Sequence, residues 1–350
     1  MSRFLSPKRA ALAPYTPGEQ PKTAGLIKLN TNESPYPPSP RVIEAITPEA
    51  VARLRLYSDI QTTALSRAIA DRYHLEPGQV LAGNGSDEVL SLAFQAFGEG
   101  GVAFPDITYG FYAVWAALYG CPARTAPLRE DFTVPLDAFM TNRETVFLAN
   151  PNAPTGIALP LAEIRRLLEA NPDRVVVMDE AYVDFGGESA APLIDEYENL
   201  LVVQTFSKSR QLAGGRLGFA MGSRALIDDL NRVKFSFHPY NVNTLTQLAG
   251  EAAMRDEAYF ADCCAKIIRT RAWTAEALRA LGFRVLPSQA NFLFAAPRFL
   301  GGRAYLEALR ERNILVRHFD SERIRDYVRI TIGTQAQMEE LVRVTKELMT

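Results

Sequence analysis

The residues most able to do chemistry in this chain lie in four short polar segments, each directly after a run that is expected to form a strand. The segments are residues 83–88, 150–156, 179–182 and 205–209, and a Gly-Gly-Arg sequence follows the last one at 214–216. In parallel α/β sheets, ligands bind beyond the carboxyl ends of the strands. We therefore expect the four segments to meet in one site.

The first segment, Gly-Asn-Gly-Ser-Asp-Glu, opens a predicted helix. Gly85, Ser86 and Asp87 place free backbone N–H groups at the helix N-terminus, which favours an anion. Taken alone, Ser86 or Asp87 could simply cap the helix, which is the more common role of these residue types. The segment is not a dinucleotide fingerprint, because the third glycine of G-x-G-x-x-G is replaced by Glu88, and the chain has no G-x-x-x-x-G-K-[ST].

Asp179 follows the apolar run Val175–Met178, which is expected to be a buried strand. A carboxylate at the end of such a strand is costly unless a cation or a donor meets it, although it could also cap a helix. The last segment carries the hydroxyl side chains of one threonine and two serines and the amine of Lys208, with Arg216 eight residues further along the chain. Loop lysines are mostly solvated, so Lys208 gains its significance only from these neighbours.

Together, the four segments match pyridoxal phosphate better than any other ligand. Helix N–H groups, hydroxyls and Arg216 suit a phosphate. A buried Asp179 would keep a pyridine nitrogen protonated, the Lys208 amine would form a Schiff base with an aldehyde, and Tyr109 could stack on the ring. The residues therefore predict a pyridoxal-phosphate enzyme that transfers an amino group.

Helices that alternate with short β-rich runs must position these segments. Strands are expected at 79–82, 100–104, 145–149, 174–178, 200–204 and 216–221. Helices are expected at 62–73, 86–97, 109–119, 160–170, 224–234, 244–280 and 302–312. The long helix at 244–280 is expected to contain a polar interruption at Arg255 and Asp256. This alternation argues for a mostly parallel sheet that is covered on both faces.

Three parts of the chain are expected from the composition and the change of pattern. Residues 1–40, rich in Pro, Asn, Ser and Thr, are expected to form an arm on the small domain or on a partner subunit. Residues 41–260 are expected to form a large cofactor-binding domain, and 261–350 a small α+β domain. The small domain is expected to have strands at 283–286, 291–295, 314–318 and 328–332 and a closing helix at 335–349.

Composition disfavours several classes of protein. The 38 basic and 40 acidic residues give a net charge of −2, so neither the total nor any segment favours nucleic acid. Three cysteines lack the spacing of a disulfide framework or of a metal site, so no metal is expected. There is no signal-like apolar run and no window of about 20 apolar residues. We expect a soluble, cytoplasmic protein that does not bind a membrane.

The chain resembles the fold-type-I aminotransferases and, among them, the histidinol-phosphate aminotransferase family. The resemblance covers nearly the whole chain and rests on the motifs Asn-Pro-Asn-x-Pro-Thr-Gly, Asp-Glu-Ala-Tyr and Ser-Lys-x7-Arg, in that order and spacing. Leu-Tyr-Ser-Asp at 56–59 and Ile-Leu-Val-Arg at 314–317 narrow it toward the histidinol-phosphate group. It implies a mostly parallel seven-stranded sheet between helices, a smaller α+β domain and a homodimer.

The resemblance also implies a role for each matching residue. Lys208 would hold pyridoxal 5'-phosphate and shuttle a proton between Cα and C4′, Asp179 would pair with the ring nitrogen, and Tyr182 would hydrogen-bond the 3′ oxygen. The other expected cofactor-binding residues are Gly85, Ser86, Asp87, Tyr109, Asn152, Thr205, Ser207, Arg216 and, from the second subunit, Tyr57. The expected substrate-binding residues are Tyr15, Asn32, Tyr57, Arg317 and Arg329. Among these, Arg329 would hold the α-carboxylate, and Tyr15 and Arg317 would meet the distal phosphate, with Tyr57 as a further candidate.

One position departs from the family pattern. The family has Asn directly before Pro-Thr-Gly, where it hydrogen-bonds the 3′ oxygen of the ring, and this chain has Ala153. Either Asn152 reaches the ring instead, or Tyr182 holds that oxygen alone. The loss of one neutral hydrogen bond is worth about 1 kcal/mol, which would tune catalysis without abolishing it.

The activity that the resemblance implies is transamination between histidinol phosphate and 2-oxoglutarate or glutamate, in histidine biosynthesis. An aromatic or broad-specificity aminotransferase and a threonine-phosphate decarboxylase of the same fold remain alternatives. A nicotinamide oxidoreductase is disfavoured because the glycine fingerprint is absent. A non-enzymatic binding protein is disfavoured because Lys208 and Asp179 are both present.

Overall fold

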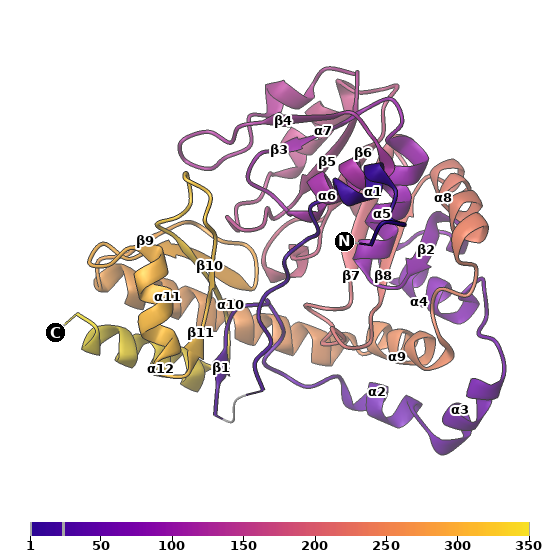
Figure 1. Cartoon of the computed structure of the whole chain (residues 1–350). Helices are drawn as coiled ribbons and strands as arrows, with labels where there is room; N and C mark the ends of the chain where they lie inside the picture. The colour runs from indigo at the N-terminus through magenta and orange to yellow at the C-terminus, as the bar shows by residue number, and fades with distance from the viewer. Residues whose placement is uncertain (1, 23–24, 350) are drawn as a thin grey trace.

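The computed structural model describes residues 2–22 and 25–349. A large sheet and a small sheet are connected by helix α10 (Glu257–Ala280), which begins near the large sheet and ends beside the small one (Figure 1). The N-terminal arm runs from the large part of the molecule to the small sheet (Figure 1). No helix in the described ranges is long and apolar enough to cross a membrane.

Within the described residues, seven strands form the large sheet, in the order β2-β8-β7-β6-β5-β3-β4. Their bounds are Val80–Gly83 (β2), Val102–Pro105 (β3), Ala123–Ala126 (β4), Thr145–Ala149 (β5), Val176–Asp179 (β6), Leu200–Thr205 (β7) and Gly218–Gly222 (β8). Neighbouring strands are parallel, except that β8 is antiparallel to both β2 and β7. The predicted mostly parallel seven-stranded sheet is confirmed.

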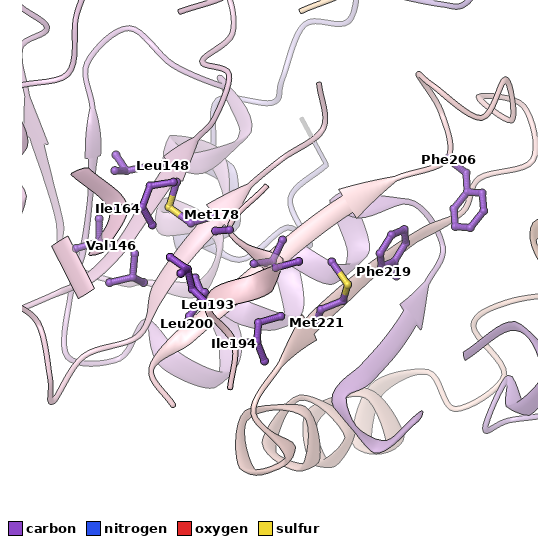
Figure 2. Packing of buried hydrophobic residues seen from close by; sticks show 14 of the residues in the cluster. Val146, Leu148, Ile164, Met178, Leu193, Ile194, Leu200, Phe206, Phe219 and Met221 are labelled. Atoms are coloured by element: carbon purple, nitrogen blue, oxygen red, sulfur yellow. The ribbon is translucent and has the colours of Figure 1, made fainter. Parts of the chain in front are cut away.

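The central strands are buried along their whole length because helices cover both faces of the sheet. Alternate residues point to opposite faces, so Val146 and Leu148 join one apolar core while Phe147 joins the other. Figure 2 shows Leu148 of β5 and Met178 of β6 packed with Ile164 of α7 (Leu161–Glu169). Each such side chain contributes about 1.5–3 kcal/mol by leaving water. This burial holds the strand ends in a fixed register.

The helices that cover the large sheet agree closely with the sequence prediction. They are α4 (Thr63–Tyr73), α5 (Ser86–Phe97), α6 (Phe111–Tyr119), α7, α8 (Arg224–Phe237) and α9 (Thr244–Arg255). The single helix predicted over 244–280 is wrong, since α9 and α10 are separate helices. Asp256 breaks the run because its backbone leaves the helical region (φ −98°, ψ 65°) and its carboxylate caps α10 by accepting from the Tyr259 N–H.

Strand β4 was not predicted from the sequence. It pairs only with β3 at the edge of the sheet, and its sequence Ala-Arg-Thr-Ala lacks the apolar run of a central strand. Three short proline-initiated helices in the N-terminal region were also not predicted. They are α1 (Pro7–Ala10), α2 (Pro40–Ala45) and α3 (Pro48–Ala52).

The small sheet is antiparallel, with the order β12-β13-β10-β9. Its strands are β9 (Arg284–Val285), β10 (Phe292–Ala296), β12 (Arg317–His318) and β13 (Val328–Thr331), with α10, α11 (Gly302–Arg310) and α12 (Gln335–Glu347) around it. The arm joins this part, because β1 (Ile27–Lys28) pairs in parallel with β11 (Ile314–Leu315), and Leu29 lies in the separate apolar core that packs against the small sheet. The predicted domain boundary near residue 260 stays a prediction.

Candidate active site

The polar segments predicted from the sequence meet at one edge of the large sheet. Gly218 of β8 pairs with Gly83 of β2 and with Thr205 of β7, while Asp179 of β6 pairs with Ala149 of β5. Because β8 is antiparallel, its first residue lies at the edge where its neighbours end. The Gly-Gly-Arg sequence before β8 is thereby placed beside the segments that follow β2 and β7.

A cavity of about 720 Å³ lies over this edge. Its lining comes from the sheet edge, from residues 317–329 beside the small sheet, and from the arm at 15–20 and 30–33. The sequence-predicted residues that line it are Tyr15, Asn32, Ser86, Asp87, Tyr109, Asp179, Tyr182, Thr205, Ser207, Lys208, Arg216, Arg317 and Arg329.

Three predicted residues lie outside this lining, for different reasons, and the first two are Gly85 and Tyr57. Gly85 lies directly behind Arg216, and a Cβ at Gly85 would come within 2.6 Å of the Arg216 Nη2. Tyr57 is 82% exposed and stacks on Tyr240, with ring centroids 4.4 Å apart. Within one chain, Tyr57 therefore does not reach the cavity.

Asn152 also lies outside the lining, beneath it. Its Oδ1 accepts a hydrogen bond from Thr108 Oγ1 (2.8 Å), and its Nδ2 donates to the Ile107 carbonyl (3.0 Å) and to Thr155 Oγ1 (3.1 Å). The buried amide is fully engaged in holding the loops that carry Thr108 and Thr155. Its neighbour Ala153, in contrast, does line the cavity.

Lys208 lies inside the cavity with its amine near two groups of the site. The Nζ donates to the Thr31 carbonyl (3.2 Å) and lies 5.8 Å from the centroid of the Tyr182 ring. Burial, together with the nearby Arg329 cation, lowers the pKa of the Lys208 amine to about 8. A fraction of the amine is therefore unprotonated near neutral pH, as a nucleophile or a base requires.

Asp179, the last residue of β6, is buried at the base of the cavity. Tyr112 Oη donates to its Oδ2 (2.8 Å), and the Ala181 N–H donates to its Oδ1 (3.3 Å). Burial raises the pKa of Asp179 to about 6, and the two hydrogen bonds oppose that rise. The carboxylate is consequently an anion at neutral pH, which is the partner that a cationic ring nitrogen requires.

Tyr112 is a residue of the candidate site that sequence reasoning missed. It is fully buried, it lies three residues after Tyr109, and the two rings meet edge to face with centroids 5.7 Å apart. The only hint in the sequence was that a second tyrosine follows Tyr109 at a spacing of three. The contact between Tyr112 and Asp179, which are 67 positions apart, depends on the fold.

The start of helix α5 forms one end of the cavity and suits an anion. Tyr109 Oη donates to Asp87 Oδ1 (2.6 Å), and Arg216 Nη2 donates to Asp87 Oδ2 (3.3 Å), so Asp87 fixes both side chains. A Cβ at Gly218 would lie 2.2 Å from the Ser86 nitrogen, which means that only glycine lets β8 lie against the start of the helix. Helix N–H groups beside an arginine are the usual donor set for a phosphate.

Two arginines lie at the other end of the cavity, directly opposite one another in the β12–β13 ladder. Arg317 pairs with Arg329 in register, and each guanidinium carbon is 5.6 Å from the centroid of the Phe319 ring. Arg329 donates to the Asn30 carbonyl (3.1 Å), while its buried Nε has no partner among the described residues. Burial lowers the pKa of Arg329. An unpaired donor on a buried cation is suited to an anionic ligand.

The arm covers this end of the cavity. Arg317 donates to the carbonyls of Thr16 (3.1 Å) and Pro17 (3.3 Å), and Tyr15 stacks on Phe111 with ring centroids 4.3 Å apart. The arm thus contacts both the small sheet and helix α6, and it forms part of the lining of the cavity.

The arrangement has counterparts among known proteins. A sequence model of the family "Aminotransferase class I and II" matches residues 24–344. The histidinol-phosphate aminotransferase 1 of Bradyrhizobium diazoefficiens is 51% identical over 351 residues, which cover all of both chains. The chain belongs to the class I and II aminotransferases.

Solved structures show the fold of this aminotransferase in other proteins. The histidinol-phosphate aminotransferase of Sinorhizobium meliloti, in complex with pyridoxal-5'-phosphate, has a TM-score of 0.81 at 24% identity and covers 92% of this chain and 91% of that one. The L-threonine-O-3-phosphate decarboxylase of Porphyromonas gingivalis has a TM-score of 0.82, also at 24% identity, over 92% and 99%. The predicted fold-type-I architecture is confirmed, and the fold by itself does not separate these two reactions.

Proposed function

We propose that this aminotransferase moves the amino group of histidinol phosphate to 2-oxoglutarate, in histidine biosynthesis, with pyridoxal 5'-phosphate as its cofactor. The observation that carries the proposal is 51% identity over the full length of a histidinol-phosphate aminotransferase. The cavity supports it independently, because it has a phosphate-type anion site at one end and paired arginines at the other.

The residues present fit the cofactor. Ser86, Ser207 and Arg216 would hold its phosphate, Asp179 its ring nitrogen, and Lys208 its aldehyde carbon. When bound, pyridoxal phosphate supplies an electron sink for the charge that develops at the substrate Cα.

The remaining catalytic work falls to the side chains of the chain itself. Lys208, with a pKa lowered to about 8, would take a proton from the substrate Cα and return it on the same face of the cofactor. The buried Asp179 anion would keep the opposing ring nitrogen protonated. The arm and Phe319 would limit water around Lys208 while this transfer occurs.

The paired arginines suit the anionic groups of both amino donors. Histidinol phosphate has one anionic group, a phosphate, and no carboxylate, so Arg317 would bind that phosphate beside Arg329, while Arg329 would bind the α-carboxylate of glutamate. In the second half-reaction, Arg317 would accept the distal carboxylate of glutamate. Arg317→Ala is therefore expected to impair both half-reactions, and normal turnover of glutamate in this variant would contradict the shared use of Arg317.

A single-turnover experiment tests the substrate and the alternatives together. Purified enzyme loaded with pyridoxal phosphate is mixed with histidinol phosphate, phenylalanine, aspartate or threonine phosphate, and loss of its visible absorption band is followed. The proposal predicts the fastest loss with histidinol phosphate. Faster reaction with phenylalanine or aspartate would favour the broad-specificity alternative, and release of CO₂ from threonine phosphate would favour the decarboxylase.

We further propose that the enzyme is a cytoplasmic homodimer in which Tyr57 of each subunit completes the phosphate site of the other. Two groups of exposed apolar side chains, one on residues 43–57 and one on 235–240, meet where Tyr57 stacks on Tyr240. A group of exposed apolar side chains of this kind usually marks a protein–protein interface. Its exposed members are Ile43, Val51, Leu54, Leu56, Tyr57, Phe235, Phe237 and Tyr240.

A further inference from the structure

The departure at Ala153 leaves an apolar surface where the family places an amide. Ala153 packs with Ala290 and Phe292, and Tyr182 lies against this group. Asn152 does not fill the gap, because its amide is bonded beneath the cavity. Tyr182 therefore needs support from another part of the chain if its hydroxyl is to be held in one orientation.

Asn32, from the arm, contacts the Tyr182 hydroxyl. Its Nδ2 donates to Tyr182 Oη at 2.9 Å. The Asn32 N–H donates to Thr331 Oγ1 (3.0 Å), Thr331 Oγ1 donates to Asn32 Oδ1 (3.0 Å), and Asn291 Nδ2 donates to the Asn32 carbonyl (3.0 Å). Every polar atom of the buried Asn32 is engaged, so its amide has one orientation.

This geometry determines which way the Tyr182 hydroxyl acts. Because Tyr182 Oη accepts from Asn32, its own proton is free to be donated to a group in the cavity. A hydroxyl that accepts one hydrogen bond is also a stronger donor in the next. Asn32 has a positive φ of 56°, a conformation that asparagine tolerates better than most residues, and this turns its side chain from the arm toward Tyr182.

We propose that Asn32 is a positioning residue that, through Tyr182, replaces the amide missing at Ala153. The hydrogen-bond chain runs from Thr331 through Asn32 to Tyr182, and from there to the 3′ oxygen of the cofactor. The inference rests on the proposed use of pyridoxal phosphate. It differs from a role for Asn32 in binding substrate, which would require its amide to face the substrate.

The test is a pH titration of the visible absorption band of the loaded enzyme without substrate. A donor at the 3′ oxygen reduces the negative charge that retains the proton on the neighbouring Lys208 nitrogen. Asn32→Ala weakens that donor, so the midpoint should rise by about 0.5–1 pH unit. The double variant Asn32→Ala/Ala153→Asn restores a donor to the ring and should return the midpoint toward the wild-type value.

Two further variants act as controls. Thr331→Val leaves Asn32 in place but removes the hydroxyl that orients it, and it should raise the midpoint in the same direction, whereas Thr331→Ser should not. These variants keep the proposal testable if Asn32→Ala folds poorly by circular dichroism. An unchanged midpoint in folded Asn32→Ala, with only a raised KM for the amino substrate, would overturn the proposal. If wild-type protein takes up no pyridoxal phosphate, the proposed function fails instead.

Discussion

At the scale of single residues, the site combines groups whose ionisation is set by burial and by one or two named neighbours. Lys208 is the main example, since burial lowers its pKa to about 8 while that of an exposed lysine is near 10.5. Asp179 shows the opposite shift for the same reason, with a pKa raised to about 6. Both shifts imply that burying these two groups in the cavity lowers the free energy of unfolding.

Lys208→Met should remove activity while stabilising the cofactor-free protein at neutral pH. Between about pH 8 and 10.5 the unfolded chain binds the proton more tightly than the folded one, so wild-type stability increases as pH rises through that window. The variant lacks this dependence. Its unfolding free energy should exceed that of the wild type by about 1–3 kcal/mol at pH 7, and by much less above pH 10.5. Urea denaturation at pH 7 and above pH 10.5 measures the difference in unfolding free energy between the variant and the wild type. The same difference at both pH values would contradict the prediction.

Tyr112→Phe should move the acid limb of the pH–activity profile to higher pH. The variant removes the hydroxyl that donates to Asp179, and losing a hydrogen bond to a carboxylate raises its pKa. Activity at pH 7 should fall about threefold to tenfold.

The matched control for Tyr112→Phe is Tyr305→Phe. Tyr305 is equally buried, but its hydroxyl pairs with that of Thr345 between α11 and α12, outside the lining of the cavity. This control should lower stability and leave the pH profile unchanged. A shifted profile in Tyr305→Phe would mean that the effect of Tyr112→Phe is structural.

At the scale of elements, the strand ends and the start of α5 were predictable from the sequence. The edge strand β4 and the contacts between side chains that are distant in the sequence were not. Apolar runs bounded by glycine and polar residues identified β2, β5, β6 and β7, because burial on both faces demands such runs. Edge strand β4 lacks that signal. The contact between Asn32 and Tyr182 joins residues 150 positions apart, and only the docking of the arm on the small sheet creates it.

Gly218→Ala should weaken cofactor binding by displacing the start of α5. The new methyl would lie 2.2 Å from the backbone nitrogen of Ser86, and that backbone cannot shift as easily as the end of a flexible side chain. Overpacking of this kind costs about 1–3 kcal/mol. Gly301→Ala is the control, because a Cβ there meets nothing within 4 Å. Fluorescence titration with pyridoxal phosphate should give a raised Kd for Gly218→Ala only, and equal affinities would show that the contact is not rigid.

At the scale of the whole molecule, the cavity is assembled from parts that fold around different cores. The large sheet provides Lys208 and Asp179, the small sheet provides Arg317 and Arg329, and the arm closes the space between them. The residues of each part could be predicted from the sequence, but the distances between the parts could not. Tyr57 is a predicted site residue, but in the described chain it lies exposed on an outer surface. The proposed dimer would bring it into the site of the partner subunit.

Mixing two defective variants tests that assignment of Tyr57. Lys208→Ala subunits lack the amine but have an intact Tyr57, and Tyr57→Ala subunits have the reverse defect. In a two-fold dimer with shared sites, each hybrid has one site with both residues and one with neither. Unfolding and refolding a 1:1 mixture should therefore restore about a quarter of wild-type activity by statistical pairing. Light scattering should give twice the mass of one chain throughout. Dimers that recover no activity on mixing would place Tyr57 outside the partner's site, and a monomeric wild type would exclude the shared site altogether.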